Sequence, residues 1–445
     1  MLHRLTAGLL ATGIVALLVK VLEIQPTTAK TVQLLAWQNM PLFSTLSQPD
    51  PAVEAIIRQY VKSWGTKGAG EANQAVWIQS GLTVLADNQG KVPLPAASLT
   101  KIATTLAALE KWGPSHRFET IVSATGPIKN GVLQGDLVIT GGGDPLFVWE
   151  EAIALGNSLN QMGIRQVAGN LIINGDFYVN YEENPVVSAQ LLQQAFNSQK
   201  WSRGFVYRYS LMPPKTPKPQ IAIAGGIKVA SLPLPKKLLL LRHQSLPLDL
   251  ILREMNIHSN NHMADMLTKA LGGPQVRTQL AAQSAAISPN ELQLVNGSGL
   301  GVENRMSARA VCALLIGVDR FLQAHNLNIA DVFPLAGRDK QGTLYGRKLP
   351  VGTAMKTGTL RDVSALAGVI PTRDRGRVWF VIMNRGNDIW GFRSQQDQLV
   401  EQLSQHWGNP PTLQTRTAST DISEVSRLLG DSKRNQTVVS SRVKT

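Results

Sequence analysis

Cysteine and metal-ligand patterns are almost absent from this 445-residue sequence. Its single cysteine, Cys312, excludes a disulfide within the chain. Cys312 lies in the apolar run ARAVCALLIGV, where we expect a buried, inert thiol. The seven histidines are scattered, and the pair His258 and His262 lacks a third ligand nearby. The sequence therefore predicts no metal site and no cofactor.

Long basic runs are also missing, although Lys and Arg outnumber Asp and Glu by 44 to 30. The resulting net charge of +14 favours anionic surroundings, such as nucleic acid, lipid headgroups or an acidic wall polymer. No block of five or more basic residues and no nucleic-acid-binding motif accompanies that charge. We therefore expect no nucleic-acid partner.

The N-terminal apolar stretch is too short to be typical of a membrane span, which needs about 20 residues. After His3 and Arg4, fifteen uncharged residues run from Leu5 to Val19. A basic start followed by an apolar core of this length favours an export signal. Because Thr27-Thr28-Ala29 matches a cleavage site only weakly, residues 1–29 are expected to be either a signal peptide or a retained membrane anchor.

Hydrophobic periodicity elsewhere predicts mixed helices and strands. Helices are expected over residues 51–64, 150–162 and 307–319 and in the segment RSQQDQLVEQLSQHW. Strands are expected in QAVWIQSGLTVLADNQG, VGTAMKTGTL, VSALAGVI and RVWFVIMN. From about Tyr181 to Pro235 the pattern weakens, with MPPKTPKP and SLPLPKK as proline-punctuated loops. After Gly408 the sequence is mostly polar.

One strongly apolar helix, in the segment PAASLTKIATTLAALEKWG, carries a serine and a lysine at its start. Ser98 and Lys101 lie three residues apart, so their side chains point to the same side. Burying an ammonium group costs free energy, so a lysine at this apolar position indicates a chemical role for Lys101. Burial or a second cation nearby would lower the pKa of Lys101 and make its amine a base for the Ser98 hydroxyl.

Two further motifs supply candidates for the rest of an acyl-transfer site. SNN places Ser259 and Asn261 at a predicted break between helices, where short side chains can reach into a cleft. MKTGTL places four candidates on a predicted strand: Lys356, Thr357, Gly358 and Thr359. The glycine would let a substrate backbone lie against the strand edge, and Lys356 would supply a cation.

Each motif is weak by itself. An SxxK pattern arises by chance roughly once or twice in a chain of this length. Ser259 is also compatible with a helix cap, and Lys356 with a solvated strand residue. The order SxxK, SxN, KTG along one chain, however, is the signature of penicillin-recognising serine enzymes.

The chain resembles the D-alanyl-D-alanine carboxypeptidase/endopeptidase family, the low-molecular-mass class C penicillin-binding proteins. The resemblance covers roughly residues 74–407 and includes GDLVITGGGDPLF, NGSGLGVENRMSA and FPLAGRDKQGTLYGRKL. It implies an α/β fold of the α+β type, β-lactamase/transpeptidase-like, in which an antiparallel sheet is flanked by helices beside a helical cluster. It also implies peptidoglycan peptides ending in D-Ala-D-Ala as substrates and β-lactam antibiotics as covalent inhibitors.

The resemblance also implies roles for the motif residues. Ser98 would be the acylated nucleophile and Lys101 its base. Ser259 would relay a proton to the departing D-alanine, and Asn261 would orient Lys101 and the substrate amide. Lys356 and Thr357 would hold the terminal carboxylate. The backbone N–H groups of Ser98 and Thr359 would form the oxyanion hole, beside Gly358.

The spacing of the motifs predicts a discontinuous catalytic domain. Ser259 follows Ser98 by 161 positions, which leaves room for an inserted domain. We expect the catalytic domain over 30–117 and 241–408, the insert over 118–240 and a largely disordered tail over 409–445. Export would bring the protein to the periplasm or the outer face of the cytoplasmic membrane, with membrane contact only through the N-terminal anchor.

Two alternatives share these motifs. A class A β-lactamase would add a Glu-x-x-Leu-Asn loop, but in the nearest match, Glu291 to Val295, valine takes the place of that asparagine. A catalytically silent wall-binding scaffold on the same fold is disfavoured, because every catalytic side chain is present. Slow deacylation after reaction with penicillin would separate a carboxypeptidase from a β-lactamase.

Overall fold

The computed structural model describes residues 46–65, 70–231, 237–408, 425 and 428–438. The predicted signal peptide or anchor, residues 1–29, lies outside the described residues. Within the described part, no helix is both long and apolar enough to cross a membrane.

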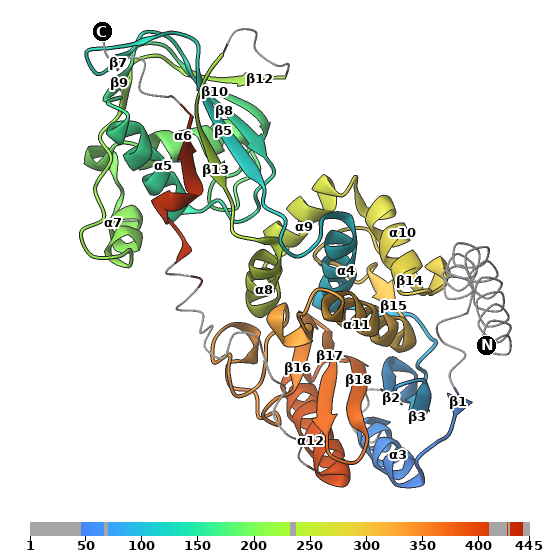
Figure 1. Cartoon of the computed structure of the whole chain (residues 1–445). Helices are drawn as coiled ribbons and strands as arrows, with labels where there is room; N and C mark the ends of the chain where they lie inside the picture. The colour runs from blue at the N-terminus through green and yellow to red at the C-terminus, as the bar shows by residue number, and fades with distance from the viewer. Residues whose placement is uncertain (1–45, 66–69, 232–236, 409–424, 426–427, 439–445) are drawn as a thin grey trace, which may run out of the picture.

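A six-stranded sheet forms the centre of the catalytic unit (Figure 1). Its order is β1-β3-β2-β18-β17-β16, antiparallel throughout except for the parallel pair β1 and β3. The strands span Leu46–Ser47 (β1), Gln74–Ser80 (β2), Thr83–Asn88 (β3), Ala354–Leu360 (β16), Val363–Thr372 (β17) and Gly376–Arg385 (β18). Strand β16, which carries the KTG motif, is therefore the edge strand of this sheet, and only its start is bridged on the outer side, between Leu335 and Ala354.

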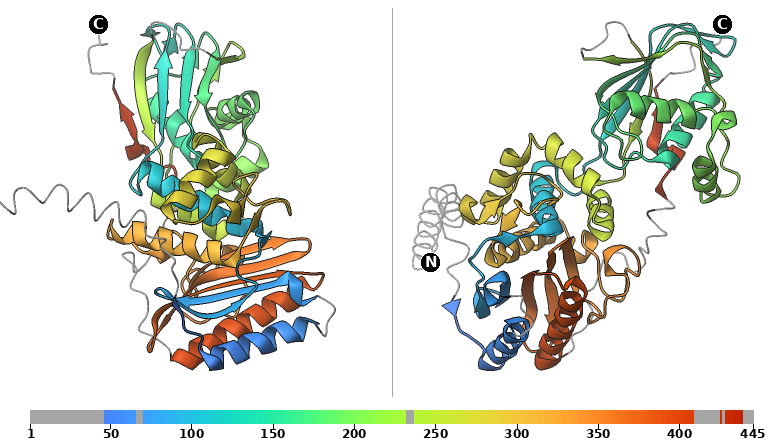
Figure 2. Two further views of the ribbon diagram at one scale, coloured as in Figure 1. Left: turned by 90° about the vertical axis from the view of Figure 1, so that its right-hand side faces the viewer. Right: turned by 180° about the vertical axis from the view of Figure 1, so that it is seen from behind.

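Helices cover both faces of this sheet (Figure 2). One face packs against α3 (Pro51–Gly65) and α12 (Ile389–Trp407), whose Trp64 and Phe392 rings lie 4.3 Å apart. The other face packs against a helical cluster built around α4, and strand residues alternate between the two cores. The cluster comprises α4 (Thr100–Trp112), α8 (Leu248–His258), α9 (Asn261–Ala270), α10 (Pro274–Ser284) and α11 (Ala308–Gln323). A small sheet beside it comprises β4 (Leu94–Pro95), β14 (Leu292–Gln293) and β15 (Arg305–Met306). The predicted fold class is confirmed.

A second unit, here called the insert, lies between α4 and α8 in the chain and has its own apolar core. Its six-stranded sheet has the order β12-β10-β8-β5-β13-β19. The strands span Glu119–Ala124 (β5), Leu137–Gly142 (β8), Leu171–Asp176 (β10), Ile227–Ala230 (β12), Leu238–Gln244 (β13) and Asn435–Thr437 (β19). Four short strands form a separate sheet: β6 (Ile128–Lys129), β7 (Val132–Leu133), β9 (Gln166–Val167) and β11 (Ala222–Ile223). Because β13 extends to Gln244, the insert's sheet runs four residues past the boundary predicted at 240.

Three helices complete the insert: α5 (Trp149–Gln161), α6 (Pro185–Ala195) and α7 (Arg203–Ser210). The last two lie in the stretch 181–235, where the sequence pattern is weak and the sequence analysis names no helix. Asn184 caps α6 and Pro185 occupies its first turn, so the helix begins with ordinary start signals, and it is the apolar periodicity that is weak. Its buried residues include two alanines and a serine, which give a weak hydrophobic signal.

The prediction of a disordered tail is wrong for residues 428–438. Asn435–Thr437 form β19, which pairs antiparallel with β13 at the edge of the insert's sheet (Figure 1). Arg434 forms an ion pair with the buried carboxylate of Glu151 on α5 and donates to the carbonyl of Gln244 at 3.0 Å. The side chain of Asn435 donates to Ser158 Oγ at 2.9 Å. Polar composition predicts disorder, but here the polar groups find buried partners that composition does not show.

We expect the tail to stabilise the insert through the Arg434–Glu151 ion pair. Arg434→Met would leave a buried carboxylate without a cation, which costs about 3–5 kcal/mol. Urea unfolding followed by circular dichroism measures this loss, with Lys433→Met as an exposed control that should unfold like the wild type. If Arg434→Met and Lys433→Met unfold at the same urea concentration, the ion pair does not stabilise the insert.

Candidate active site

Ser98 lies in a 3₁₀ turn, Ala97–Leu99, immediately before α4. Ala97 adopts a left-handed backbone conformation with φ of 48°, which is strained for a residue with a Cβ. Two glycines hold this turn closely. A Cβ at Gly299 would lie 1.9 Å from the Ala97 carbonyl oxygen, and one at Gly358 would lie 2.9 Å from the Ala96 carbonyl oxygen. The turn therefore presents Ser98, which is half-buried, at the meeting point of α4, β16 and the loop around Gly299.

Lys101 lies in the first turn of α4 and is fully buried. Its Nζ is 3.1 Å from Ser98 Oγ. The same nitrogen donates to Asn261 Oδ1 at 2.8 Å and to the carbonyl oxygen of Ser298 at 2.7 Å. The structure thus brings together Ser98, Lys101 and Asn261, three of the predicted residues.

The surroundings of Lys101 suit a neutral amine. Burial lowers the pKa of Lys101 to about 7, although the negative charge of Asp265 acts in the opposite direction. A neutral amine has two N–H donors and one lone pair. Because Asn261 and the Ser298 carbonyl accept two hydrogen bonds, the lone pair is left to face the Ser98 hydroxyl.

Asp265 on α9 fixes the loop that contacts Lys101. The sequence motifs do not point to this residue. Its Oδ1 accepts hydrogen bonds from the backbone N–H groups of Gly297 and Ser298, at 2.8 and 2.9 Å. These bonds hold the loop whose carbonyl contacts Lys101. The stretch NGSGLGVENR carries part of the family resemblance, but its hydrogen bond with Lys101 is made by the backbone carbonyl of Ser298. Contacts made by the backbone leave little trace in a sequence pattern.

Ser259 and Lys356 form the second half of the site. Ser259 ends α8 in a left-handed conformation with φ of 52°, and α9 begins at Asn261. Lys356 Nζ donates to Ser259 Oγ at 3.0 Å and to the Thr357 carbonyl at 2.8 Å. Burial lowers the pKa of Lys356 well below its usual value, and the positive charge of Lys101 lowers it further. The two amines therefore resist being charged together.

The remaining predicted residues follow Lys356 along β16. Thr357 is buried, whereas Thr359 is exposed. On the side away from β17, the start of β16 is bridged to the preceding loop at Leu335 and Ala354, and Met355 N–H donates to the Pro334 carbonyl at 3.0 Å. No further strand pairs with β16 beyond this bridge in the described sheet, which leaves that part of the edge for an extended peptide. Gly358 has no room for a side chain because it packs against the turn of Ser98.

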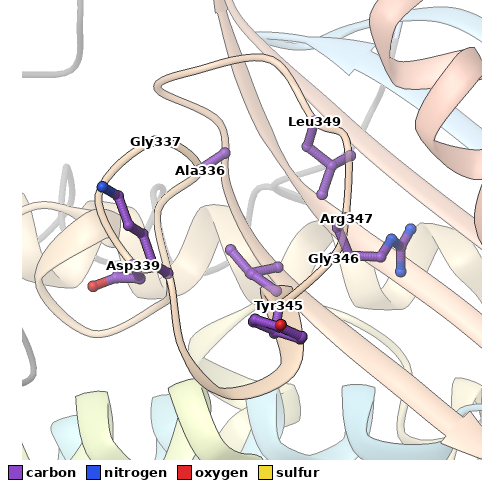
Figure 3. Close-up of a pocket in the computed structure, with 9 residues that line it drawn as sticks. Ala336, Gly337, Asp339, Tyr345, Gly346, Arg347 and Leu349 are labelled. Atoms are coloured by element: carbon purple, nitrogen blue, oxygen red, sulfur yellow. The ribbon is translucent and has the colours of Figure 1, made fainter.

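A cavity of about 230 Å³ lies in the loop that precedes β16 (Figure 3). Asp339, Lys340 and Tyr345 are among its lining residues, and none of the predicted site residues lines it. The Asp339 carboxylate is engaged by Arg253 at 2.6 Å. This cavity is thus separate from the Ser98–Lys101 pair.

The sequence predicts neither a β-lactamase general base at Glu291 nor a metal site. Glu291, the nearest match to a β-lactamase general base, forms an ion pair with Arg309 and accepts a hydrogen bond from Ser307 Oγ at 2.6 Å. Its carboxylate is therefore occupied away from Lys101. Among the residues that the structure describes, no group of three or more His, Cys, Asp or Glu residues could hold a metal ion.

The model of the D-Ala-D-Ala carboxypeptidase 3 (S13) family matches residues 59–200 and 215–406. The chain belongs to this family. The match covers both the catalytic unit and most of the insert. Membership makes the chain a serine-type D-Ala-D-Ala carboxypeptidase, and the family predicted from the motifs is confirmed.

Two curated relatives carry the same activity in their names. The D-alanyl-D-alanine carboxypeptidase DacB of Haemophilus influenzae is 23% identical, over 67% of this chain and 82% of the relative. A D-alanyl-D-alanine carboxypeptidase of an Actinomadura species is 25% identical, over 72% of this chain and 78% of the relative.

Solved structures share the fold. The predatory endopeptidase Bd3459 of Bdellovibrio bacteriovorus superposes with a TM-score of 0.66 and 25% identity, covering 76% of this chain and 94% of that one. Its penicillin G-acylated form gives a TM-score of 0.69 at 24% identity, with coverage of 82% and 99%. Penicillin-binding protein 4 of H. influenzae, complexed with a β-lactam, gives 0.60 at 20% identity, with coverage of 77% and 99%.

We expect Asp265 to set the pH at which the site becomes reactive. The neutral amine of Lys101 is the form that can take a proton, so acylation by penicillin should rise as the pH passes through about 7. Asp265→Asn removes the negative charge that raises the pKa of Lys101 but keeps an oxygen for Gly297 and Ser298. The rising limb should therefore move to a pH lower by roughly 0.5 to 1.

The measurement is the second-order rate constant for labelling by fluorescent penicillin between pH 5 and 9. Asp362→Asn, which removes a carboxylate paired with Arg385 at the far end of the β16–β17 turn, is the matched control. A limb that stays in place in Asp265→Asn, or moves to higher pH, contradicts the electrostatic role of Asp265.

Proposed function

We propose that the chain cleaves the terminal D-Ala-D-Ala bond of peptidoglycan stem peptides through an acyl-enzyme on Ser98. One observation carries this proposal: Lys101 Nζ lies 3.1 Å from Ser98 Oγ while its other hydrogen-bonding capacity is taken by Asn261 and the Ser298 carbonyl. A buried neutral amine aimed at a hydroxyl is the arrangement that activates a serine nucleophile.

In the first step, Ser98 Oγ attacks the carbonyl carbon of the penultimate D-alanine, and Lys101 takes the hydroxyl proton. Negative charge develops on the carbonyl oxygen, where the backbone N–H groups of Ser98 and Thr359 would stabilise it. The side-chain oxygen of Asn261 keeps Lys101 in position, and its NH₂ group is left to donate to the peptide.

In the second step, the C–N bond breaks and the leaving nitrogen of the terminal D-alanine needs a proton. Ser259 Oγ accepts a hydrogen bond from Lys356, so its own O–H is free to donate to that nitrogen. The proton lost to Lys101 reaches the amine through Ser259. Water then attacks the ester, releases the shortened peptide and restores the Ser98 hydroxyl.

Strand β16 would hold the substrate. An extended peptide would pair with the outer edge beyond the Leu335–Ala354 bridge, where Gly358 lets the strand approach the Ser98 turn closely. Lys356, Thr357 and Thr359 lie at the end of the site that would receive the terminal carboxylate. The same chemistry would serve DD-endopeptidase cleavage of a cross-link, because the leaving residue there also has a D-centre next to a carboxyl group.

The location of such a substrate requires export. We infer that residues 1–29 direct the chain to the periplasm or the outer face of the cytoplasmic membrane, where peptidoglycan and β-lactams are accessible. The basic start and short apolar core of that segment support the inference. The net charge of +14 would favour association with an anionic wall.

Removing the Ser98 hydroxyl should abolish both reactions. Ser98→Ala should bind no fluorescent penicillin covalently and should release D-alanine from a diacetyl-Lys-D-Ala-D-Ala peptide at least about 1000-fold more slowly than the wild type. Labelling is measured on a denaturing gel, and D-alanine by a coupled oxidase assay.

Ser80→Ala removes an exposed hydroxyl that contacts the Arg375 carbonyl, far along the β2–β18 pairing, and should label like the wild type. Equal labelling of Ser98→Ala and wild type would show that another residue is the nucleophile. Rapid hydrolysis of the penicillin adduct would favour β-lactamase activity instead of carboxypeptidase activity.

A further inference from the structure

An arginine from a different part of the chain reaches the end of the KTG strand. Arg393 lies near the start of α12, and its Nη2 donates to Thr359 Oγ1 at 3.0 Å. Its guanidinium also lies over the ring of Trp390, 5.0 Å from the centroid. Trp390 is 78% exposed, so the ring and the arginine form an accessible edge beside β16.

Arg393 forms no ion pair among the residues that the structure describes, although the charge of Asp397 acts on it from a longer distance. The acidic residue one turn further along α12, Asp397, is paired with Arg347 at 2.7 Å and accepts the backbone N–H of Lys348 at 2.9 Å. By contrast, Arg385 at the neighbouring end of β18 is paired with Asp362 at 2.9 Å. A guanidinium that forms no ion pair and contacts Thr359 at the end of the KTG strand is suited to bind an anion from the substrate.

Both lysines of the site already have hydrogen-bond partners within the protein, so a further cation would strengthen the binding of a carboxylate. Lys101 is directed at Ser98, and Lys356 is fully buried and donates to Ser259 and the Thr357 carbonyl. Burial lowers the pKa of both lysines. An arginine stays charged at every working pH.

We propose that Arg393 binds the terminal carboxylate of the substrate and thereby selects peptides that end in a free carboxyl group. This inference rests on the proposed function and adds a specificity-determining residue to it. Thr359 Oγ1 accepts a hydrogen bond from Arg393, so its own O–H remains free to donate to the same carboxylate. Thr357 and Thr359 are two residues apart on β16 and project to the same side of the strand.

The test compares two peptides that differ only at the C-terminus: diacetyl-Lys-D-Ala-D-Ala with a free carboxylate, and the same peptide as a carboxamide. For Arg393→Gln, we expect kcat/KM on the acid to fall roughly 10- to 150-fold, the range expected for losing a hydrogen bond to a charged group. The loss should appear mainly in KM. On the carboxamide, kcat/KM should change less than about threefold, so the acid-to-amide ratio collapses.

Two further variants sharpen the result. Arg393→Lys keeps the charge but not the planar fork, and it should restore part of the preference for the acid. Arg58→Gln removes one positive charge from an exposed position on α3, where Arg58 pairs with Glu54, and should keep the wild-type ratio. Thermal melting of each variant checks that Arg393→Gln is folded, and Arg393→Lys carries the test if it is not.

The outcomes separate this inference from the proposed function. If wild type releases D-alanine and Ser98→Ala does not, the proposed function holds. In that case, an unchanged acid-to-amide ratio in Arg393→Gln, or an equal loss on both peptides, overturns the role of Arg393. If the wild type cleaves neither peptide, it is the proposed function that fails.

Discussion

The site depends on one constraint: an amine must stay uncharged inside the protein while it touches a serine hydroxyl. Lys101 is fully buried on α4, among the apolar residues of the helical cluster. The protonated, charged form of Lys101 loses its hydration by burial, and its surroundings compensate for this loss only in part. Burial therefore lowers the pKa of Lys101 to about 7. The same burial that makes the helix core stable therefore makes the lysine a base.

The geometry of Ser98 and Lys101 depends on backbone turns in strained conformations, which closely packed neighbouring elements hold in place. Ala97 and Ser259 both adopt left-handed conformations, each of which costs on the order of 1–3 kcal/mol at a non-glycine residue. Gly299 and Gly358 pack against the Ala97 turn so closely that a Cβ at either position would collide with it. Two distant segments, the Gly299 loop and strand β16, thus hold one turn.

The insert and the tail show a second use of distant segments. The insert has an apolar core of its own, yet the edge strand of its sheet comes from the C-terminal tail. Arg434 and Glu151 are 283 residues apart in the chain and form a buried ion pair. Arg393 and Thr359 meet in the same way across 34 residues. In each pair, a charged or polar group is bound by a partner that lies close to it only in the folded structure.

The sequence by itself determined the fold class, the family and the residues that gather around Ser98, because the SxxK, SxN and KTG motifs occur in a fixed order on recognisable elements. It did not reveal α6, whose buried face is rich in small residues, or the ordered part of the tail, whose composition is polar. It also did not single out Asp265, the Ser298 carbonyl or Arg393. These groups act through backbone atoms or through single contacts between segments far apart in the chain. Such contacts have no local periodicity, so only the tertiary structure, which brings the segments within hydrogen-bonding distance, decided them.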